Sequence, residues 1–417
     1  MTSGDSPGSA IHGGASQGGA SHDGGGHGGA SHGGASQGGA SQGGASHGGA
    51  SHDGGGQAHA GWLAPVTAAR MAAAARALLA GVAGERRSVL NPEFEDFDLG
   101  SPRRHWTYLP VTERPGLALR GLPDPERKLA HELIVASVSM DGYAKVVSVM
   151  AMEHVRRALV QAATPANAHL FDPERYCFRI FGHPGDPGDP RAAPWGWQLA
   201  GHHVSLNFTV ADGYVSATPC MFGSVPASYG PLSPLEREEA DGYRFVNSLT
   251  GGQRAKAVIW HRPPPDFATR VVPRIGETEV PDHVFAPEPG YRISDEERAA
   301  LAYVRSGPRG VSGAALTAEQ LDALTDLVAL FAGRLPSEVA AAELRRVEAA
   351  GAENLWFAWA GGTRPGERHY YRVQGPGLLI EHDNTQGGGN HVHSVWRVPG
   401  GDFGDDLLAA HYRDTPH

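Results

Sequence analysis

The feature that most limits how this chain can fold is a change of hydrophobic period that occurs twice. Segments with the 3.6-residue period of amphipathic helices precede segments with the two-residue period of strands, and past Pro234 the same order begins again. An antiparallel sheet with helices packed on one side accommodates this order, because each strand then buries one face. The sequence therefore predicts an α+β fold made of two similar units.

The predicted strands lie at the end of each half. They are 176–181, 195–200, 202–210 and 214–218 in the first half, and 355–360, 369–374, 378–383 and 391–396 in the second. Helical periodicity precedes each set, beginning at Val66 and resuming after Pro125 in the first half. Residues 141–145 (DGYAK) are expected to interrupt a helix there.

Four pairs of segments match in the same order between the halves. AGERRSVL matches GGQRAKAV, LPDPERKLAHELI matches LTAEQLDALTDLV, YCFRIFG matches WFAWAG, and GWQLAGHHVSLNFT matches YYRVQGPGLLIEHDNT. The last match places Asn207 on Glu381 and Thr209 on Asp383. We therefore expect an internal duplication, with units 66–230 and 235–414 in one globular domain. A pseudo-twofold axis would relate them, with a pocket where they meet.

Residues 1–60 have low complexity and repeat GGASH or GGASQ. Glycine loses much backbone freedom on ordering and no side chain here is large enough to form a core, so the composition predicts a disordered tail. Its regularly spaced histidines can bind transition metals loosely, as a store or a delivery arm. Glutamine occupies many of the same positions, which favours a repeat without a role in metal binding.

The composition excludes some classes of partner. The 417-residue chain has a net charge of −10 and no cluster of Lys and Arg, which argues against nucleic acid and anionic membranes as partners. No apolar run approaches the roughly 20 residues needed to span a bilayer, and the N-terminus does not resemble a signal peptide. We expect a soluble, cytoplasmic protein whose two cysteines, Cys177 and Cys220, are buried thiols.

The stretch 378–397 (LLIEHDNTQGGGNHVHSVWR) concentrates histidines and acids on a predicted hairpin. A loop centred near Gly387 sets Asp383 opposite His391 and Glu381 opposite His393, because both strands alternate faces with period two. The four side chains would then share one face and could converge on one cation. The alternative is an ordinary solvated face of a hairpin.

A further ligand is expected from the first half. His203 is predicted on a polar strand face with Ser205 and Asn207, and the internal match makes this the counterpart of the face that carries Glu381 and Asp383. His202 falls on the opposite, apolar face, where a histidine is usually a hydrogen-bonded core residue.

Several motifs resemble a known family. GHHVSLNFT, GGQRAKAVI, HYYRVQGP and above all IEHDNTQGGGNHVHSVWR are similar to those of a bacterial family catalogued as domain of unknown function 3500, from about residue 66 to the C-terminus. The resemblance implies no activity, because that family is uncharacterised. It also implies an aromatic residue such as Tyr where this chain has His382, so His382 is not expected to be an essential ligand. The histidine-rich tail lies outside the resemblance.

These observations lead to a functional hypothesis. We expect a metal-dependent enzyme that hydrolyses or oxidises a small polar or peptide-like substrate, with zinc, iron or manganese as its metal. The expected metal ligands are His203, His391, His393 and Glu381. The expected catalytic residues are Glu381 or Asp383 as general base and Arg372, which could hold a substrate carboxylate or pair with one of these acids. The alternatives are a non-catalytic metal store and a scaffold without metal, and the sequence does not predict an oligomeric state.

Overall fold

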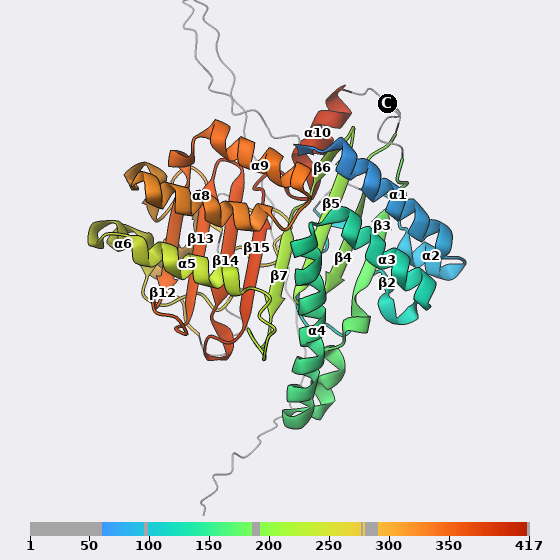
Figure 1. Ribbon diagram of the computed structural model, residues 1–417, viewed down its shortest axis with the longest axis horizontal. Helices are drawn as coiled ribbons and strands as arrows, with labels where there is room; N and C mark the ends of the chain where they lie inside the picture. Colours follow the sequence, from blue (N-terminus) through green and yellow to red (C-terminus); the bar gives the residue numbers. More distant parts are fainter. Residues whose placement is uncertain (1–60, 96–98, 186–191, 277, 280–290, 415–417) are drawn as a thin grey trace, which may run out of the picture. The chain divides into compact units, whose positions relative to one another are not determined.

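One large sheet dominates the part of the chain that the computed structural model describes, which is residues 61–95, 99–185, 192–276, 278–279 and 291–414 (Figure 1). Its central path runs β11 (Val311–Ser312), β12 (Trp356–Gly361), β13 (His369–Gly375), β14 (Leu378–Asn384), β15 (Val392–Arg397), β7 (Cys220–Ser224), β5 (Val204–Ala211), β4 (Trp195–Gly201), β3 (Cys177–Phe181) and β2 (Leu117–Ala118). Neighbours on this path are antiparallel.

Short strands extend this arrangement. β6 (Tyr214–Ser216) pairs with β5 and with β1 (Trp62–Leu63), while β8 (Val258–Trp260) runs parallel to β12. β9 (Thr278–Glu279) and β10 (Tyr303–Val304) form a separate two-stranded sheet. The mixture of helices with a largely antiparallel sheet confirms the predicted α+β class.

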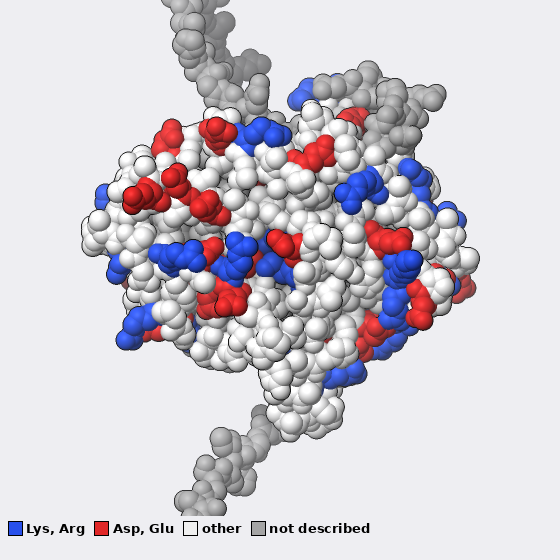
Figure 2. All heavy atoms as spheres, viewed as in Figure 1, with Lys and Arg blue, Asp and Glu red and all other residues white. Residues whose placement is uncertain are grey.

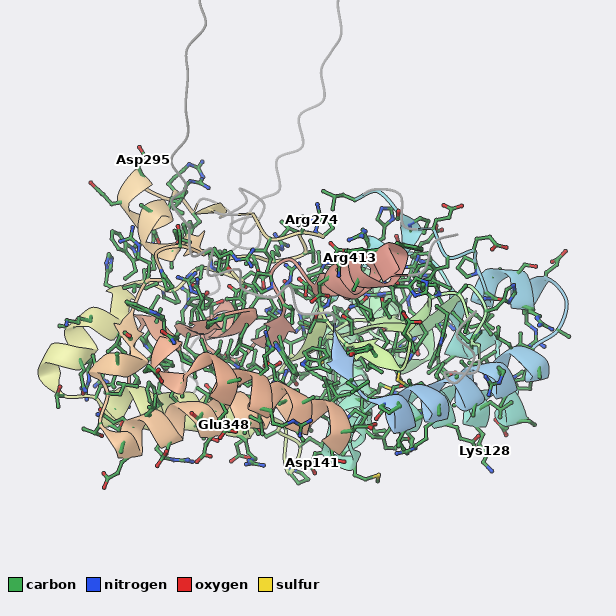
Figure 3. The ribbon with its side chains drawn as sticks, turned by 90° about the horizontal axis from the view of Figure 1, so that it is seen from above. Lys128, Asp141, Arg274, Asp295, Glu348 and Arg413 are labelled. Atoms are coloured by element: carbon green, nitrogen blue, oxygen red, sulfur yellow. The ribbon has the colours of Figure 1, made fainter. Side chains whose placement is uncertain are left out.

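Helices cover one face of the sheet. In the first half these are α1 (Pro65–Gly81), α3 (Asp124–Ser137) and α4 (Met140–Ala163), and in the second α5 (Glu236–Ser248), α8 (Ala318–Ala332) and α9 (Ser337–Ala350) (Figure 1). The shorter helices are α2 (Glu85–Leu90), α6 (Gly251–Ala257), α7 (Asp295–Leu301) and α10 (Asp405–Asp414). Figure 3 shows α7 and α10, marked by Asp295 and Arg413, on the opposite side of the sheet from Lys128, Asp141 and Glu348.

The two faces of the sheet differ in chemistry. Under the helices, alternate strand residues such as Trp197, Leu206, Ile380 and Trp396 belong to one hydrophobic core. The residues between them point to the other face and are polar but equally buried: Arg179, Gln198, Ser205, Asn207, Thr209, Arg372, Gln374, Glu381, Asp383, His393 and Arg397. Loops cover this second face, which we call the polar face, and supply its hydrogen-bond partners.

The surface over the helices carries both signs of charge. Figure 2 shows Lys and Arg side chains close to Asp and Glu side chains across this view, including the region of α5. Arg244 of that helix, for example, pairs with Asp241 at 2.7 Å. Within the described residues, no helix combines the length and apolarity required to cross a membrane.

The strand order has a regular form on either side of the β15–β7 pair. The neighbours of β15 are β14, β13 and β12 in turn, and those of β7 are β5, β4 and β3. The β4–β5 turn closes with Gly201 opposite Val204, and the β13–β14 turn closes with Gly375 opposite Leu378.

Local corrections follow from the structure. The predicted interruption at 141–145 is wrong, because α4 begins at Met140 and continues through it. The chain turns earlier, where the Ser139 side chain accepts a hydrogen bond from the backbone nitrogen of Gly142 and caps α4. The predicted strand 202–210 begins only at Val204, and β7 was not among the predicted strands. The predicted disorder of 1–60 lies outside the described residues.

Candidate metal centre

Three histidines meet where the β4–β5 turn contacts the start of β15. His203 lies in that turn with a φ of 63°, in the left-handed region that few residues other than glycine adopt. Two backbone hydrogen bonds hold it, from its own nitrogen to the Tyr108 oxygen at 3.0 Å and from the Gly223 nitrogen to its oxygen at 2.8 Å. A Cβ at Gly223 would lie 2.9 Å from Cδ2 of His203, so glycine gives the ring its space.

His391 and His393 complete this group, which we call the histidine cluster. The Nε2 atoms of His203 and His391 lie 2.9 Å apart, and one ligand atom from each of the three residues lies within 4.8 Å of the others. Two nitrogens that each bind one ion at about 2.1 Å are about 3.0 Å apart at a right angle and about 3.4 Å apart at a tetrahedral angle. The spacing of His203 and His391 therefore fits two ligands of a single transition-metal ion, and His393 lies close enough to be a third after a small movement of its ring.

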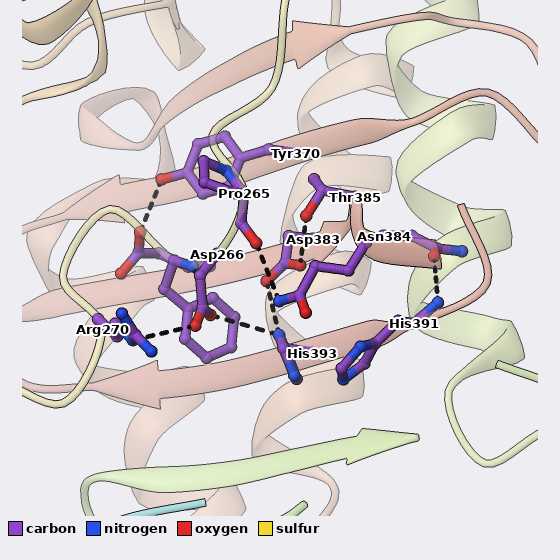
Figure 4. Close-up of polar contacts among 12 residues, drawn as sticks. Pro265, Asp266, Arg270, Tyr370, Asp383, Asn384, Thr385, His391 and His393 are labelled. Atoms are coloured by element: carbon purple, nitrogen blue, oxygen red, sulfur yellow. Dashed lines mark hydrogen bonds and ion pairs between the residues drawn. The ribbon is translucent and has the colours of Figure 1, made fainter. Parts of the chain in front are cut away.

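Two carboxylates hold the other nitrogen of His393. Its Nδ1 lies 3.3 Å from Oδ1 of Asp266 and 3.3 Å from Oδ2 of Asp383. Figure 4 shows both acids next to the His393 ring, with His391 beside it on the same strand end. Such a carboxylate contact on the second ring nitrogen is typical of metal-binding histidines, because it orients the ring and raises its basicity.

Asp266 is itself held firmly. Its Oδ1 accepts hydrogen bonds from the Tyr108 hydroxyl at 2.9 Å and from the Phe267 nitrogen at 2.8 Å, and Arg270 pairs with its Oδ2 at 3.2 Å. The rings of Tyr108 and Phe267 also pack against His393, with centroids 5.3 and 5.6 Å away. The loop that covers the polar face thus positions one side of the cluster.

The surroundings of the cluster shift the pKa values of its histidines in opposite directions. Burial alone lowers the pKa of His393, but Asp383 and Asp266 outweigh this and raise it to about 10. Burial and the neighbouring histidines lower the pKa of His203 and His391 well below the usual value, so both rings are neutral near pH 7. Burial raises the pKa of Asp383 to about 7 against the opposing effect of His393. Two neutral imidazoles and two nearby carboxylates surround His393, which is protonated near pH 7 and would have to release its Nε2 proton to bind a metal ion.

His202 lies behind the cluster. Its ring stacks on His203 with centroids 3.7 Å apart, and its Nδ1 lies 2.7 Å from Oε1 of Glu153 on α4. Burial raises the pKa of Glu153 to about 8. His202 is therefore a buried, hydrogen-bonded residue, as expected from the sequence. Glu153, His202 and His203 also lie close enough to form a second possible ligand group.

The predicted hairpin register is wrong by two residues. Asp383 is opposite His393 rather than His391, Glu381 is opposite Val395, and His391 precedes β15. The shift is an even number of residues, so Glu381, Asp383 and His393 still share the polar face. The loop keeps its length but moves by one residue to 385–391, so His391 lies in the loop and its ring meets that of His203.

Two of the predicted site residues are engaged elsewhere on the polar face. The Glu381 carboxylate accepts hydrogen bonds from the Ala268 nitrogen at 2.7 Å, the Thr269 hydroxyl and the Tyr370 hydroxyl at 2.8 Å. Arg372 donates to the backbone oxygens of Leu301 and Ala302. Among the contacts of the described residues, neither side chain bonds to the histidine cluster.

Tyr108, Glu153 and Asp266 were not found from the sequence. Asp266 follows three prolines in an irregular stretch, where no periodicity assigns its side chain to a face. Glu153 lies on a helix in the sequence MEHV, and only its burial in the structure distinguishes it from a surface acid. Of the three clustered histidines, His391 is partly exposed and the other two are buried.

Comparison with known proteins gives a family match over most of the chain. The model of a family described as protein of unknown function (DUF3500) matches residues 64–405, which confirms the resemblance seen in the motifs. No curated protein and no solved structure matches the chain.

Proposed function

The chain belongs to this family of unknown function, and we propose from the geometry of its histidine cluster that it is a metal-dependent enzyme. His203, His391 and His393 would hold one divalent transition metal. The observation that carries the proposal is the convergence of these three rings from distant parts of the sequence, within 4.8 Å of one another. Two carboxylates behind His393 support it, because they orient that ring.

The kind of ligand favours zinc and hydrolysis. A centre of two histidines and one carboxylate is typical of non-haem iron, but here Asp266 and Asp383 contact Nδ1 of His393. Three imidazoles without a carboxylate are the ligand set of some catalytic zinc sites, in which the fourth position is open to water or substrate. Zinc bound in this way lowers the pKa of its water ligand to near 7 and polarises a substrate carbonyl.

The protein's own residues have separate roles in this proposal. Asp266 and Asp383 fix the orientation of His393, and the left-handed turn fixes that of His203. The partly exposed side of His391 admits the small polar or peptide-like substrate. Glu381 and Arg372 have no catalytic role in it, because their polar atoms anchor the covering loops.

We also propose that the two halves of the sheet arose by duplication. The strand order outward from β15 and β7 supports this, as do the matching turns, in which His203 has a φ of 63° and Gly377 a φ of 67°. In the register of these turns Asn207 corresponds to Glu381, as the sequence match requires. The cluster then combines one histidine from the first half with two from the second.

Elemental analysis tests the metal centre. After dialysis we expect about one zinc per chain in the full-length protein and in a variant that lacks residues 1–60, because the cluster lies outside that tail. His391→Ala should lose this metal, because it removes one of the three proposed ligands. The variant should still fold, since His391 is partly exposed and its removal leaves the core intact.

His382→Tyr is the matched control. His382 is buried on β14, but it points to the helix-covered face and stacks on Tyr371 with centroids 4.9 Å apart. This variant should keep its metal. A store in the tail would instead lose most of its metal with residues 1–60, and a scaffold would bind none in any variant. Hydrolysis of an ester and peptide library, abolished by a chelator and restored by zinc, tests the enzymatic part of the proposal.

A further inference from the structure

A separate pocket lies at the edge of the sheet that β2 and β3 form. Residues 112–120, which lead into and through β2, and residues 174–177, which lead into β3, line it. Its volume is about 300 Å³, at the lower end of the range for small-molecule sites. Its lining includes no member of the histidine cluster and neither of the two carboxylates that contact His393.

Two arginines bring positive charge into this pocket. Arg114 and Arg175 both line it, and both are partly exposed. Nη2 of Arg114 donates to the backbone oxygen of Leu109. Nη2 of Arg175 donates to the backbone oxygens of Val111, at 3.2 Å, and of Thr112. One short loop therefore holds both guanidinium groups at the pocket.

Neither guanidinium has an acid as its partner. Within the described part of the chain, no Asp or Glu forms an ion pair with Arg114 or Arg175, and Nη1 of each makes no hydrogen bond and is not fully enclosed. Burial lowers the pKa of Arg114, and the charge of Arg175 acts in the same direction. Burial also raises the pKa of Glu153 to about 8, so near pH 7 this neighbouring carboxyl is mostly neutral and does not compensate Arg114.

The other charged residues that line the pocket do not change this balance. Arg120 pairs with Asp172, and Glu174 pairs with Arg127, whose Nη1 lies 2.6 Å from its Oε2. Glu113 is exposed and forms no ion pair among the described residues, so water screens its charge. The two unpaired guanidinium groups outnumber this one carboxylate, and the pocket keeps an excess of positive charge.

The two arginines are close neighbours, since the thiol of Cys177 donates to the backbone oxygen of Arg114 at 3.8 Å and to that of Arg175 at 3.4 Å. Two like charges that are partly removed from water repel each other and are costly without a partner. A guanidinium group matches the geometry of phosphate and carboxylate oxygens and can donate two parallel hydrogen bonds to them. An oxyanion between the two arginines would compensate both charges.

We propose that this pocket binds the phosphate or carboxylate group of a small anionic ligand, held between Arg114 and Arg175. The pair of cations favours a group or ligand with two negative charges. The site requires no metal, so this inference does not depend on the proposed enzymatic function.

Calorimetric titration of the full-length protein with inorganic phosphate, malonate and acetate tests the proposal at pH 7.5 and constant ionic strength. Phosphate or malonate should bind with a dissociation constant of about 1 mM or lower, as expected of two charge-assisted contacts. Acetate should bind more weakly, because one charge compensates only one guanidinium. The tighter of the two divalent anions identifies the head group. Absence of binding by all three anions would overturn the proposal.

Arg114→Gln and Arg175→Gln should each weaken binding at least about tenfold, the loss of one charge-assisted hydrogen bond. Arg120→Gln is the matched control, because Arg120 also lines the pocket but already pairs with Asp172. It should change affinity by about twofold or less, the size of a screened effect. Equal losses in the three variants would mean unspecific charge attraction and would overturn the proposal.

Glu113→Gln tests the same site without removing an arginine that anchors the loop. It should strengthen anion binding by about twofold, since it removes the one unpaired acid of the lining. Weaker binding in this variant would contradict the proposal.

Phosphate also binds metal ions, so the titrations are repeated with chelator-treated protein and with His391→Ala. Anion binding should persist in both samples. Its loss there would assign the anion to the metal centre and overturn this inference, while the proposed metal site would stand.

Discussion

Replacement of Glu238 by glutamine should be among the most destabilising single changes in this fold. Glu238 of α5 is fully buried, and its Oε1 pairs with Nη2 of Arg334 at 2.8 Å and with Nζ of Lys145 at 2.9 Å. Arg334 also donates to the Ser394 hydroxyl at 2.5 Å, so this acid joins α4, α5, the end of α8 and β15. The substitution keeps the shape of the side chain and removes its charge.

The size of the loss in stability depends on the two cations that Glu238→Gln leaves without their partner, Arg334 and Lys145. Removing one partner of a buried ion pair costs about 3–5 kcal/mol, because the other charge is left uncompensated. Nε and Nη1 of Arg334 already have no hydrogen-bond partner, which places the cost near the upper part of the range. Two features reduce the cost. Lys145 is partly exposed and can turn towards water. The ring of Phe331 lies 4.1 Å from the Arg334 guanidinium and partly compensates its charge. We expect the free energy of unfolding to fall by about 4 kcal/mol.

Urea unfolding of the full-length protein at pH 7 measures this difference. Glu132→Gln, an exposed acid on α3 whose partner Lys128 is 4.0 Å away, is the control and should change stability by less than about 0.5 kcal/mol. The double variant Glu238→Gln, Arg334→Met should recover most of the loss, because it removes both charges. A loss below about 1 kcal/mol in the single variant, or no recovery in the double variant, would refute the reasoning.

Acid should weaken the same interaction. Burial alone raises the pKa of Glu238, but Arg334 and Lys145 outweigh it and lower the pKa below the usual value. The carboxylate therefore contributes its full stability above the unfolded-state pKa of about 4.3, and this contribution is lost as the pH falls through the lower folded-state value.

Three further outcomes test the site and its surroundings. Asp383→Asn should weaken zinc binding about tenfold in a competition titration, because Asp266 still orients His393, and an unchanged affinity would contradict the assigned role. Gly223→Ala should lower the free energy of unfolding by about 1–3 kcal/mol, since the added Cβ would lie 2.9 Å from His203, and thermal unfolding measures this loss. Burial lowers the pKa of His369 to about 4, below the unfolded value of about 6.5. The unfolded state therefore takes up the proton first, and the free energy of unfolding should fall by about 3 kcal/mol as the pH is lowered from about 6.5 to about 4. His369→Phe should flatten that part of a urea-unfolding pH series.

The sequence predicted those features that depend on periodicity. Alternation along β14 and β15 placed Glu381, Asp383 and His393 on one face, and this survived a register error of two residues because parity was preserved. The register itself depends on the loop between the strands, where Gly387, Gly388 and Gly389 all have positive φ. Glycines of this kind allow several loop geometries, so their spacing did not determine which residues pair.

Contacts through irregular segments were beyond sequence reasoning. Asp266 reaches His393 from a loop on the polar face, and nothing in the order PPPDF indicates that approach. His203 was expected on a strand, but it occupies the turn before β5, where its positive φ directs the ring. In each case the side chain is placed by tertiary packing rather than by a repeating local pattern.

The placement of His203 in a hairpin turn of one half, against the strand start that carries His391 and His393 in the other, has a consequence for assembly. Neither half alone contains three converging imidazoles, so the proposed metal centre forms only when β7 pairs with β15. Any mutation that loosens the pairing of β7 with β15 would weaken the proposed metal binding, even when it is far from the rings. Conversely, a bound ion would link the two halves and slow their separation.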